Sequence, residues 1–251
     1  MTQRSCVRHR AAELCLPLTA LAGAIAAAPA VAYAEPSDVL SIGYIYIAPH
    51  SSSGPLIVRE IGGQPVYLPQ AGTGTELLPA VTILLTYEHY WTTNLSTQVA
   101  LGLPPTHQVQ GAGTLAPYGV LGEGQQYSPA VVMKWHFLDA DAPLRPYVGL
   151  GVNYTWYRGS CITNDAFRTA FYGPGATTTV SASSSWNPVY NAGLDYRLDA
   201  HWSLGISLAY APLKTTTTVK ADNTMYGVPI TVTTDVQLRS WVSGANVSYR
   251  F

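Results

Sequence analysis

The sequence predicts an all-β fold, an eight-stranded antiparallel transmembrane β-barrel with short periplasmic turns and long extracellular loops. Eight segments alternate apolar and polar residues with a period of two, which is typical of strands with two different faces. Aromatic residues stand near the ends of these segments, as in the girdles of outer-membrane barrels. Charged residues make up only 11% of the chain, against about 25% in an ordinary soluble domain.

The first 34 residues are predicted to be a signal peptide that is cleaved. Residues 14–28 are apolar, and a small-x-small cleavage site ends at Ala34. The basic start of this segment is formed by Arg4, Arg8 and Arg10. Residues 35–251 are then expected to form a single outer-membrane barrel domain.

The first four predicted strands each carry an apolar set of residues facing outward. In residues 39–49 this set is Leu40, Ile42, Tyr44 and Tyr46. In residues 78–90 it is Val81, Ile83, Leu85 and Tyr87. In residues 95–103 it is Leu95, Val99, Leu101 and Leu103. In residues 127–137 it is Val131, Met133, Trp135 and Phe137.

The last four predicted strands alternate more cleanly. In residues 146–157 the outward set is Val148, Leu150, Val152, Tyr154 and Trp156. In residues 189–198 it is Tyr190, Ala192, Leu194 and Tyr196, and in residues 202–210 it is Trp202, Leu204, Ile206, Leu208 and Tyr210. In residues 236–251 it is Trp241, Ser243, Ala245, Val247, Tyr249 and Phe251. The predicted aromatic girdle consists of Trp135, Tyr154, Trp156, Trp202, Tyr210, Trp241, Tyr249 and Phe251.

Short and long connections alternate between these strands, as they do in outer-membrane barrels with short periplasmic turns. The short connections are residues 91–94, 138–144 and 199–201, and the long ones are 50–77, 106–126, 158–186 and 214–235. An even strand count places both termini in the periplasm. Residues 164–171 predict one or two helical turns, and the Thr-rich residues 214–235 predict a hairpin that extends the last two strands.

The inward residues predict a narrow lumen with a charged floor. An eight-stranded barrel has room for its own side chains or for one small ligand. Charged inward residues of both signs stand near the periplasmic ends of their strands: Glu88, Lys134, His136, Asp195, Arg197 and Arg250. Farther from the periplasm the inward residues are apolar: Ile45, Ile47, Leu84 and Val132. An apolar chamber above a charged floor favours a small hydrophobic ligand that enters from outside.

Three prolines mark one hairpin of the predicted barrel. Pro104 and Pro105 end the third strand, and Pro129 begins the fourth. Proline has no N–H to give to a ladder and is found at edges or bulges. One interpretation is a lateral opening of the barrel wall near the outer leaflet. The alternative is that these prolines only end the strands at the membrane surface.

Several motifs resemble the outer membrane protein W family. The stretch RPYVGLGVNY at residues 145–154 is similar to a motif of that family. Further similarities are the close of the fourth strand at residues 135–137, the LDY of residues 194–196, Trp202, and the terminal YRF. The resemblance implies an eight-stranded outer-membrane barrel that passes small hydrophobic molecules through a hydrophobic channel with a lateral exit. This chain departs from the family at Ser41 and Ala48, where the first strand often carries arginines.

Passive uptake of small hydrophobic molecules is therefore the expected function, and the alternative is a structural or loop-binding barrel without transport. A lipid-modifying enzyme would need a catalytic cluster near the outer rim, and the sequence shows none. His136 with Glu88 or Asp195 would suit acid–base chemistry, but at the floor a structural role is expected. Lys134 with Arg197 and Arg250 would suit an anion-selective ring, but acidic partners stand at the same level.

No cofactor or metal is expected, because the six histidines show no metal-ligand spacing. A net charge of −1 gives no electrostatic reason to expect nucleic acid. The expected partners are outer-membrane lipids and lipopolysaccharide, a small hydrophobic ligand, and the barrel-assembly machinery through the terminal Phe251. The barrel is expected to be a monomer or a weak oligomer in the bacterial outer membrane.

Overall fold

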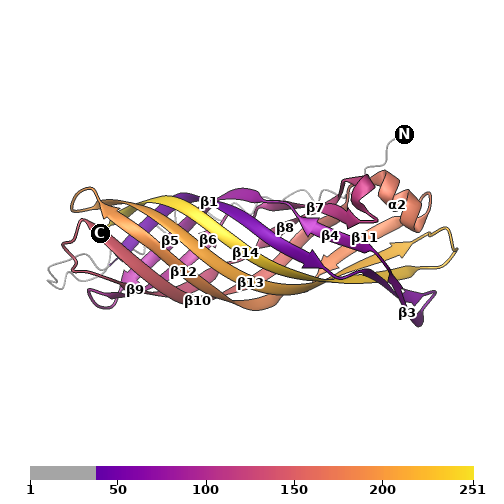
Figure 1. Cartoon of the computed structure of the whole chain (residues 1–251), viewed down its shortest axis with the longest axis horizontal. Helices are drawn as coiled ribbons and strands as arrows, with labels where there is room; N and C mark the ends of the chain where they lie inside the picture. The colour runs from indigo at the N-terminus through magenta and orange to yellow at the C-terminus, as the bar shows by residue number, and fades with distance from the viewer. Residues whose placement is uncertain (1–37) are drawn as a thin grey trace, which may run out of the picture.

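The computed structural model describes residues 38–251, which form one long β-barrel (Figure 1). The predicted signal peptide, residues 1–34, lies outside the described residues. No helix in residues 38–251 is long and apolar enough to cross a membrane.

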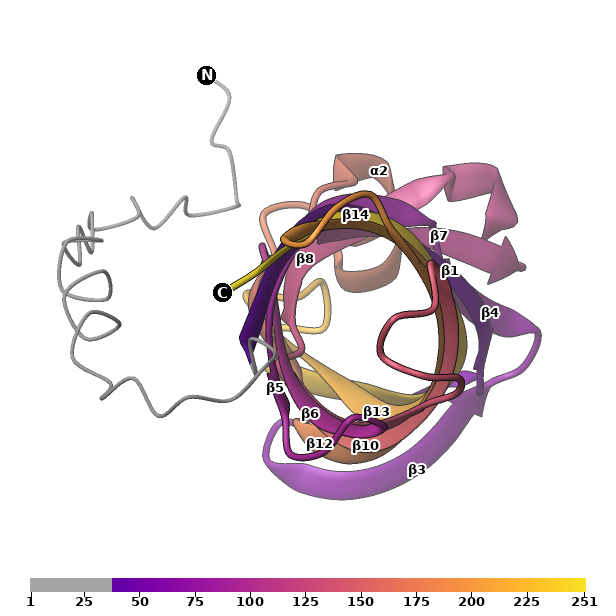
Figure 2. The same cartoon turned by 90° about the vertical axis from the view of Figure 1, so that its left-hand side faces the viewer.

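Eight antiparallel strands close the barrel into a ring. They are β1 (Asp38–Ser53), β5 (Ala80–Tyr90), β6 (Leu95–Gly102), β9 (Ala130–His136), β10 (Leu144–Ile162), β12 (Ser185–Arg197), β13 (Trp202–Asp222) and β14 (Ile230–Arg250). Each strand pairs with its neighbour in this order, and β14 pairs with β1 to complete the ring. Figure 2 shows the strands surrounding a common axis. The predicted antiparallel barrel is confirmed.

The two ends of the barrel differ. At one end, here called the turn end, short connections join the strands, and the C-terminus lies there (Figure 1). At the other end, here called the loop end, the long connections fold into further structure. Phe251 donates its backbone N–H to the Asp38 carbonyl at 3.0 Å, so the first and last described residues meet at the turn end.

An apolar band covers the outside of the eight strands. Ile42, Leu150 and Ile206 are 58%, 61% and 60% exposed, and all three belong to the predicted outward sets. Such a continuous apolar surface would be unfavourable in water and matches the hydrocarbon of a bilayer.

Aromatic residues border the apolar band at both ends, at the positions of the predicted girdle. At the turn end, Tyr249 contacts Trp202 and Phe251 with ring centroids 5.0 and 5.3 Å apart. At the opposite border, the rings of Tyr210 and Trp241 are 5.0 Å apart. The remaining predicted members, Trp135, Tyr154 and Trp156, lie on β9 and β10.

The loop end contains secondary structure beyond what the sequence predicted. The expected helical turns form α2 (Asp165–Tyr172), whose N-cap Asn164 accepts a hydrogen bond from the Phe167 N–H at 2.8 Å. The expected hairpin also forms, because β13 and β14 remain paired up to Ala221 and Ile230. Six strands and one 3-10 helix were not predicted: β2 (Leu56–Ile61), β3 (Gln64–Gln70), β4 (Thr73–Leu77), β7 (Thr106–Gly113), η2 (Ala116–Tyr118), β8 (Val120–Tyr127) and β11 (Thr177–Ala182).

These additional strands continue the barrel wall past the apolar band. β2 pairs with β14, β8 pairs with β10 and β7, β4 pairs with β7, and β11 pairs with β13. Inside them lies an apolar core to which α2 contributes Phe167 and Tyr172. Its other buried members are Leu56, Val58, Leu115, Leu121, Ile162, Ala176, Ala221, Ile230 and Val232.

Close approach between β9 and β10 gives a first testable prediction, at Gly151. A Cβ at this position would collide with the carbonyl oxygen of Val131. We expect Gly151→Ala to lower the free energy of unfolding by about 1–3 kcal/mol, as overpacking does. Denaturant unfolding of the barrel in lipid vesicles measures this change.

Gly54→Ala is the matched control, because the nearest atom to a Cβ there is the Asp235 carbonyl oxygen at 3.8 Å. Equal unfolding midpoints for the two variants would show that β9 and β10 tolerate a side chain at Gly151.

Candidate functional site

The barrel encloses a cavity of about 210 Å³, here called the lumen cavity. All four residues of the predicted apolar lumen line it: Ile45, Ile47, Leu84 and Val132. Five of the six predicted floor residues line it as well: Glu88, Lys134, Asp195, Arg197 and Arg250. The sixth, His136, is fully buried beside Glu88. The alternation of the strands therefore brings these residues from five strands to one interior space.

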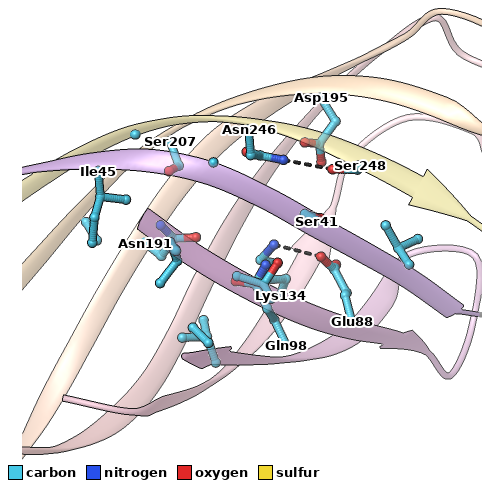
Figure 3. Close-up of a pocket in the computed structure, with 18 of the residues that line it drawn as sticks. Ser41, Ile45, Glu88, Gln98, Lys134, Asn191, Asp195, Ser207, Asn246 and Ser248 are labelled. Carbon is cyan, nitrogen blue, oxygen red and sulfur yellow. Dashed lines mark hydrogen bonds and ion pairs between the residues drawn. The ribbon is translucent and has the colours of Figure 1, made fainter. Parts of the chain in front are cut away.

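A buried ionic network centred on Glu88 forms the floor at the turn end (Figure 3). Lys134 Nζ lies 2.8 Å from Glu88 Oε2, and His136 Nε2 lies 2.9 Å from Oε1. Ser96 Oγ donates a hydrogen bond to the same Oε1 at 2.5 Å. Burying charges is costly unless each one is paired and hydrogen-bonded, and here the carboxylate has three partners. Glu88 and Lys134 are therefore a paired, hydrogen-bonded centre of the floor.

The same contacts do not make a hydrolytic triad. Ser96 and Glu88 both contact Nε2 of His136, at 3.0 and 2.9 Å. A triad needs the nucleophile on one ring nitrogen and the acid on the other. Nδ1 of His136 has no hydrogen-bond partner among the described residues. This geometry favours the structural interpretation of His136.

Three floor residues were missed by the sequence analysis: Arg145, Tyr90 and Tyr147. Arg145 is 5% exposed and donates to the Thr93 carbonyl at 2.6 Å. The Tyr90 ring lies between two guanidinium groups, with Arg145 Cζ at 5.9 Å and Arg250 Cζ at 5.4 Å. The predicted strand began at residue 146, whereas β10 begins at Leu144. Extending the alternation by one residue would have placed Arg145 on the inward face.

The cationic floor residues have partners, which weakens the interpretation as an anion-selective ring. Lys134 is paired with Glu88 and lies 4.3 Å from the centre of the Tyr147 ring. Arg197 donates to the Ala140 carbonyl and lies 3.8 Å from the Asp141 carboxylate at the rim. No row of unpaired cations therefore crosses the described part of the lumen.

The lumen cavity changes from polar to apolar with distance from the floor. Uncharged polar residues come first, and Figure 3 shows Ser41, Gln98, Asn191, Ser207, Asn246 and Ser248 around this level. Beyond them lies an apolar belt in which Val132, Val189 and Ala211 pack together. The sequence analysis expected the apolar chamber directly above the charges, so this polar layer is an addition.

A second cavity of about 130 Å³, here called the outer cavity, lies inside the loop end. Leu213 lines the lumen cavity, while Leu77, Val236 and Leu238 line the outer cavity. These four residues form one apolar cluster, in which Leu213, Val236 and Leu238 are buried. The cluster therefore stands between the two cavities as an apolar constriction.

The wall between β6 and β9 is interrupted near the middle of the molecule. The β6–β9 ladder ends at the pair Ala100 and Ala130. Pairing resumes where Pro105 accepts from the Gln126 N–H at 3.1 Å. Among the described residues, no backbone hydrogen bond joins residues 101–104 to residues 127–129. We call this interruption the wall gap.

Both margins of the wall gap are fixed to their other neighbours. Leu103 donates its N–H to the Ile83 carbonyl at 2.9 Å and accepts from Thr82 Oγ1 at 2.7 Å. On the opposite margin, Pro129 accepts from the Tyr154 N–H at 3.1 Å. The break is therefore confined to one interstrand seam, and the three prolines predicted to mark an opening lie along it.

The features described so far define a class. A closed antiparallel ring, an apolar outer band bordered by aromatics and a polar floor are those of a β-barrel outer-membrane protein. The OmpW family model matches residues 64–251, and this chain belongs to the OmpW family, whose members are outer-membrane proteins of Gram-negative bacteria.

Similar proteins support this assignment along most of the chain. Outer membrane protein W of Vibrio cholerae is 28% identical over 238 residues, covering 92% of this chain and 96% of that protein. The dibenzothiophene metabolism operon protein PahQ of Pseudomonas aeruginosa is 36% identical over 115 residues, covering 46% of this chain and 48% of PahQ. The crystal structure of OprG from Pseudomonas aeruginosa has the same fold, with a TM-score of 0.73 at 22% identity. It covers 86% of this chain and 96% of OprG.

The floor network predicts a large effect of removing its central charge. Glu88→Gln leaves the buried Lys134 ammonium without its counter-charge, and breaking such a pair costs about 3–5 kcal/mol. We expect a fall of that size in the free energy of unfolding, measured by denaturant titration in lipid vesicles.

Asp141→Asn serves as the control. The Asp141 side chain is 94% exposed, and its carboxylate lies 3.8 Å from the Arg197 guanidinium. Exposed pairs contribute little, so its unfolding curve should overlay that of the parent protein. A Glu88→Gln curve that also overlays the parent would mean that the floor does not depend on the Glu88 charge.

Proposed function

We propose that this barrel takes up small hydrophobic molecules passively across the outer membrane. In this proposal the loop end faces outward and both termini lie in the periplasm. A molecule enters the outer cavity, passes the apolar constriction to the lumen cavity, and leaves sideways through the wall gap. The observation that carries the proposal is the combination of a floor formed by a buried ionic network with an interrupted wall beside an apolar belt.

The polarity of the two routes out of the lumen supports the lateral path. Contact with the apolar belt stabilises an apolar molecule by roughly 25 cal/mol per Å² of its surface. Passage through the floor would bring that surface against the buried Glu88–Lys134 pair. The wall gap is instead bordered on its outer side by Leu101, Leu103 and Val131, which are 53%, 59% and 47% exposed. A molecule leaving there would move from apolar side chains into lipid hydrocarbon.

The name of one relative agrees with this class of ligand. PahQ is named for an operon of dibenzothiophene metabolism, and dibenzothiophene is an apolar aromatic molecule. We extend this to propose a small hydrophobic ligand for the present barrel. Its other proposed partners are outer-membrane lipids and lipopolysaccharide around the apolar band, and the barrel-assembly machinery at Phe251. The proposed state is a monomer or a weak oligomer, with no enzymatic activity.

A second candidate function is binding of a partner molecule by the loop end. Large apolar residues are exposed at the tips of the loop end, notably Tyr67, Leu68, Met225 and Tyr226. Apolar side chains exposed together often mark contact sites. In this alternative the barrel serves as an anchor and does not transport.

The proposal predicts that uptake discriminates by polarity. Liposomes containing the barrel should take up a small apolar fluorescent probe faster than empty liposomes. A charged probe of equal size should enter both at the same rate, because the floor is closed. Equal acceleration of both probes would indicate an aqueous path, and acceleration of neither would favour the loop-binding alternative.

A reversible lock across the wall gap tests the lateral route. Extending the β6–β9 register places Gly102 opposite Ser128, so Gly102→Cys with Ser128→Cys should allow a disulfide across the seam. Oxidation should slow apolar uptake, and reduction should restore it.

The control pair is Thr97→Cys with Met133→Cys, which lie opposite each other where the ladder is intact and line neither cavity. Oxidation of this pair should leave uptake unchanged. If the fully oxidised Gly102–Ser128 lock also leaves uptake unchanged, the molecule does not leave through this seam.

A further inference from the structure

The outer cavity has the size and lining of a binding site for a small molecule. Its volume of about 130 Å³ is close to that of an engineered cavity of about 150 Å³ that binds benzene. Most of its lining is apolar, including Leu56, Leu121, Ile162, Phe167 and Val219. An apolar ring or short chain would therefore fit against these side chains.

Two polar atoms in this lining lack hydrogen-bond partners. Nε2 of His107 and the hydroxyl of Tyr157 are both buried and unpaired among the described residues. His107 itself is only 4% exposed. Buried polar groups in proteins are nearly always satisfied, so each unpaired group needs an explanation. Here both groups line the same cavity.

The fold brings the two groups to one region of the cavity wall. His107 lies on β7 and Tyr157 on β10, and β8 runs between these two strands. The β8 residue paired with His107 is Gly124, and Gly122 follows on the same face. Both glycines line the cavity, and Gln126, the β8 residue paired with Tyr157, donates its side-chain amide to Ser128 Oγ at 3.0 Å.

The protonation of His107 determines which kind of ligand group it can receive. Its Nδ1 lies 3.3 Å from the Leu78 carbonyl oxygen, which can only accept, so Nδ1 carries the proton. Burial lowers the pKa of His107, and the hydrogen bond to the Leu78 carbonyl opposes that shift only in part. The ring is therefore neutral at neutral pH, and Nε2 presents a lone pair that accepts.

We propose that the outer cavity selects small apolar molecules that carry one hydroxyl group. The ligand hydroxyl donates to His107 Nε2 and accepts from the Tyr157 hydroxyl, while its apolar body packs against Phe167 and the neighbouring aliphatic residues. A ligand without the hydroxyl would leave both protein groups unpaired, which is the basis for rejecting it. The assignment rests on the proposed function, because it names the class of molecule that the uptake path prefers.

The charge of the lining favours a neutral hydroxyl over an anionic group. Among residues 38–251, Glu123 is the only carboxylate that lines the outer cavity, and no lysine or arginine lines it. A ligand carboxylate or phenolate would thus meet a negative side chain and no cation. A neutral alcohol or phenol avoids this repulsion.

A matched pair of probes tests the proposal with the purified barrel in lipid nanodiscs. The probes are 4-fluorophenol and 4-fluorotoluene, which differ only in a hydroxyl against a methyl group. Fluorine NMR titrations give both affinities, and empty nanodiscs correct for partition into lipid. We expect the phenol to bind about fivefold to a hundredfold more tightly, the effect of two hydrogen bonds. Equal affinities would overturn the proposal.

Variants of the two polar groups locate the preference. Tyr157→Phe removes a single oxygen, and His107→Leu removes the acceptor. Each should lose one of the two hydrogen bonds and reduce the preference for the phenol, and the double variant should abolish it. Tyr154→Phe is the control, because Tyr154 lies on the same strand and lines neither cavity. A preference that survives both substitutions would also overturn the proposal.

The binding experiment and the uptake experiment test different proposals, so a negative result in one does not decide the other. Apolar uptake without a hydroxyl preference would refute only the assignment of the outer cavity. A hydroxyl preference without uptake would refute only the transport function.

Discussion

The structure depends on one requirement, that backbone polar groups inside hydrocarbon must be paired within the protein. Eight antiparallel strands meet it by closing into a ring, with β1 and β14 paired along their whole shared length. Against this background the wall gap is informative, because in the described structure it leaves Gly102 and Ser128 without ladder partners across the β6–β9 seam. Pro104 lowers the cost of the break, since it has no N–H to leave unpaired. A membrane barrel can keep such an interruption only where neighbouring strands hold both margins, as β5 and β10 do here.

The interior is arranged as a sequence of layers, each with a different effect on a small molecule. The floor has the paired Glu88, Lys134 and His136 at its centre, so we infer that it is a barrier more than a binding surface. The apolar belt and the apolar constriction present aliphatic side chains, which favour contact with an apolar solute. The outer cavity has two unpaired buried polar atoms in a mostly apolar lining, and this is where discrimination between similar solutes is expected. Selection between similar solutes is thus assigned to the loop end of the barrel, and exclusion of solutes to the floor at the turn end.

Much of the ring could be predicted from sequence, because a period of two places each residue inside or outside without knowledge of its partners. Ile45, Leu84, Val132 and Lys134 were placed inward by that rule, and all line the lumen cavity. The loop-end strands could not be predicted, since β2 to β4 are short, interrupted by Gly and Pro, and stabilised by segments distant in the chain. The outer cavity was missed for the same reason, because Leu56, Leu121, Ile162 and Val219 meet only after four loops fold together. Arg145 was missed for a simpler reason, a strand boundary placed too late.

The closure of the ring also has a consequence for biosynthesis. β14 lies between β1 and β13, and Phe251 donates its N–H to the Asp38 carbonyl at 3.0 Å. β1 therefore cannot pair with β14 until the last strand has been synthesised. Any shorter chain has two open strand edges. Those edges are templates for aggregation in an aqueous compartment. A chain that stops before β14 therefore keeps two unpaired strand edges.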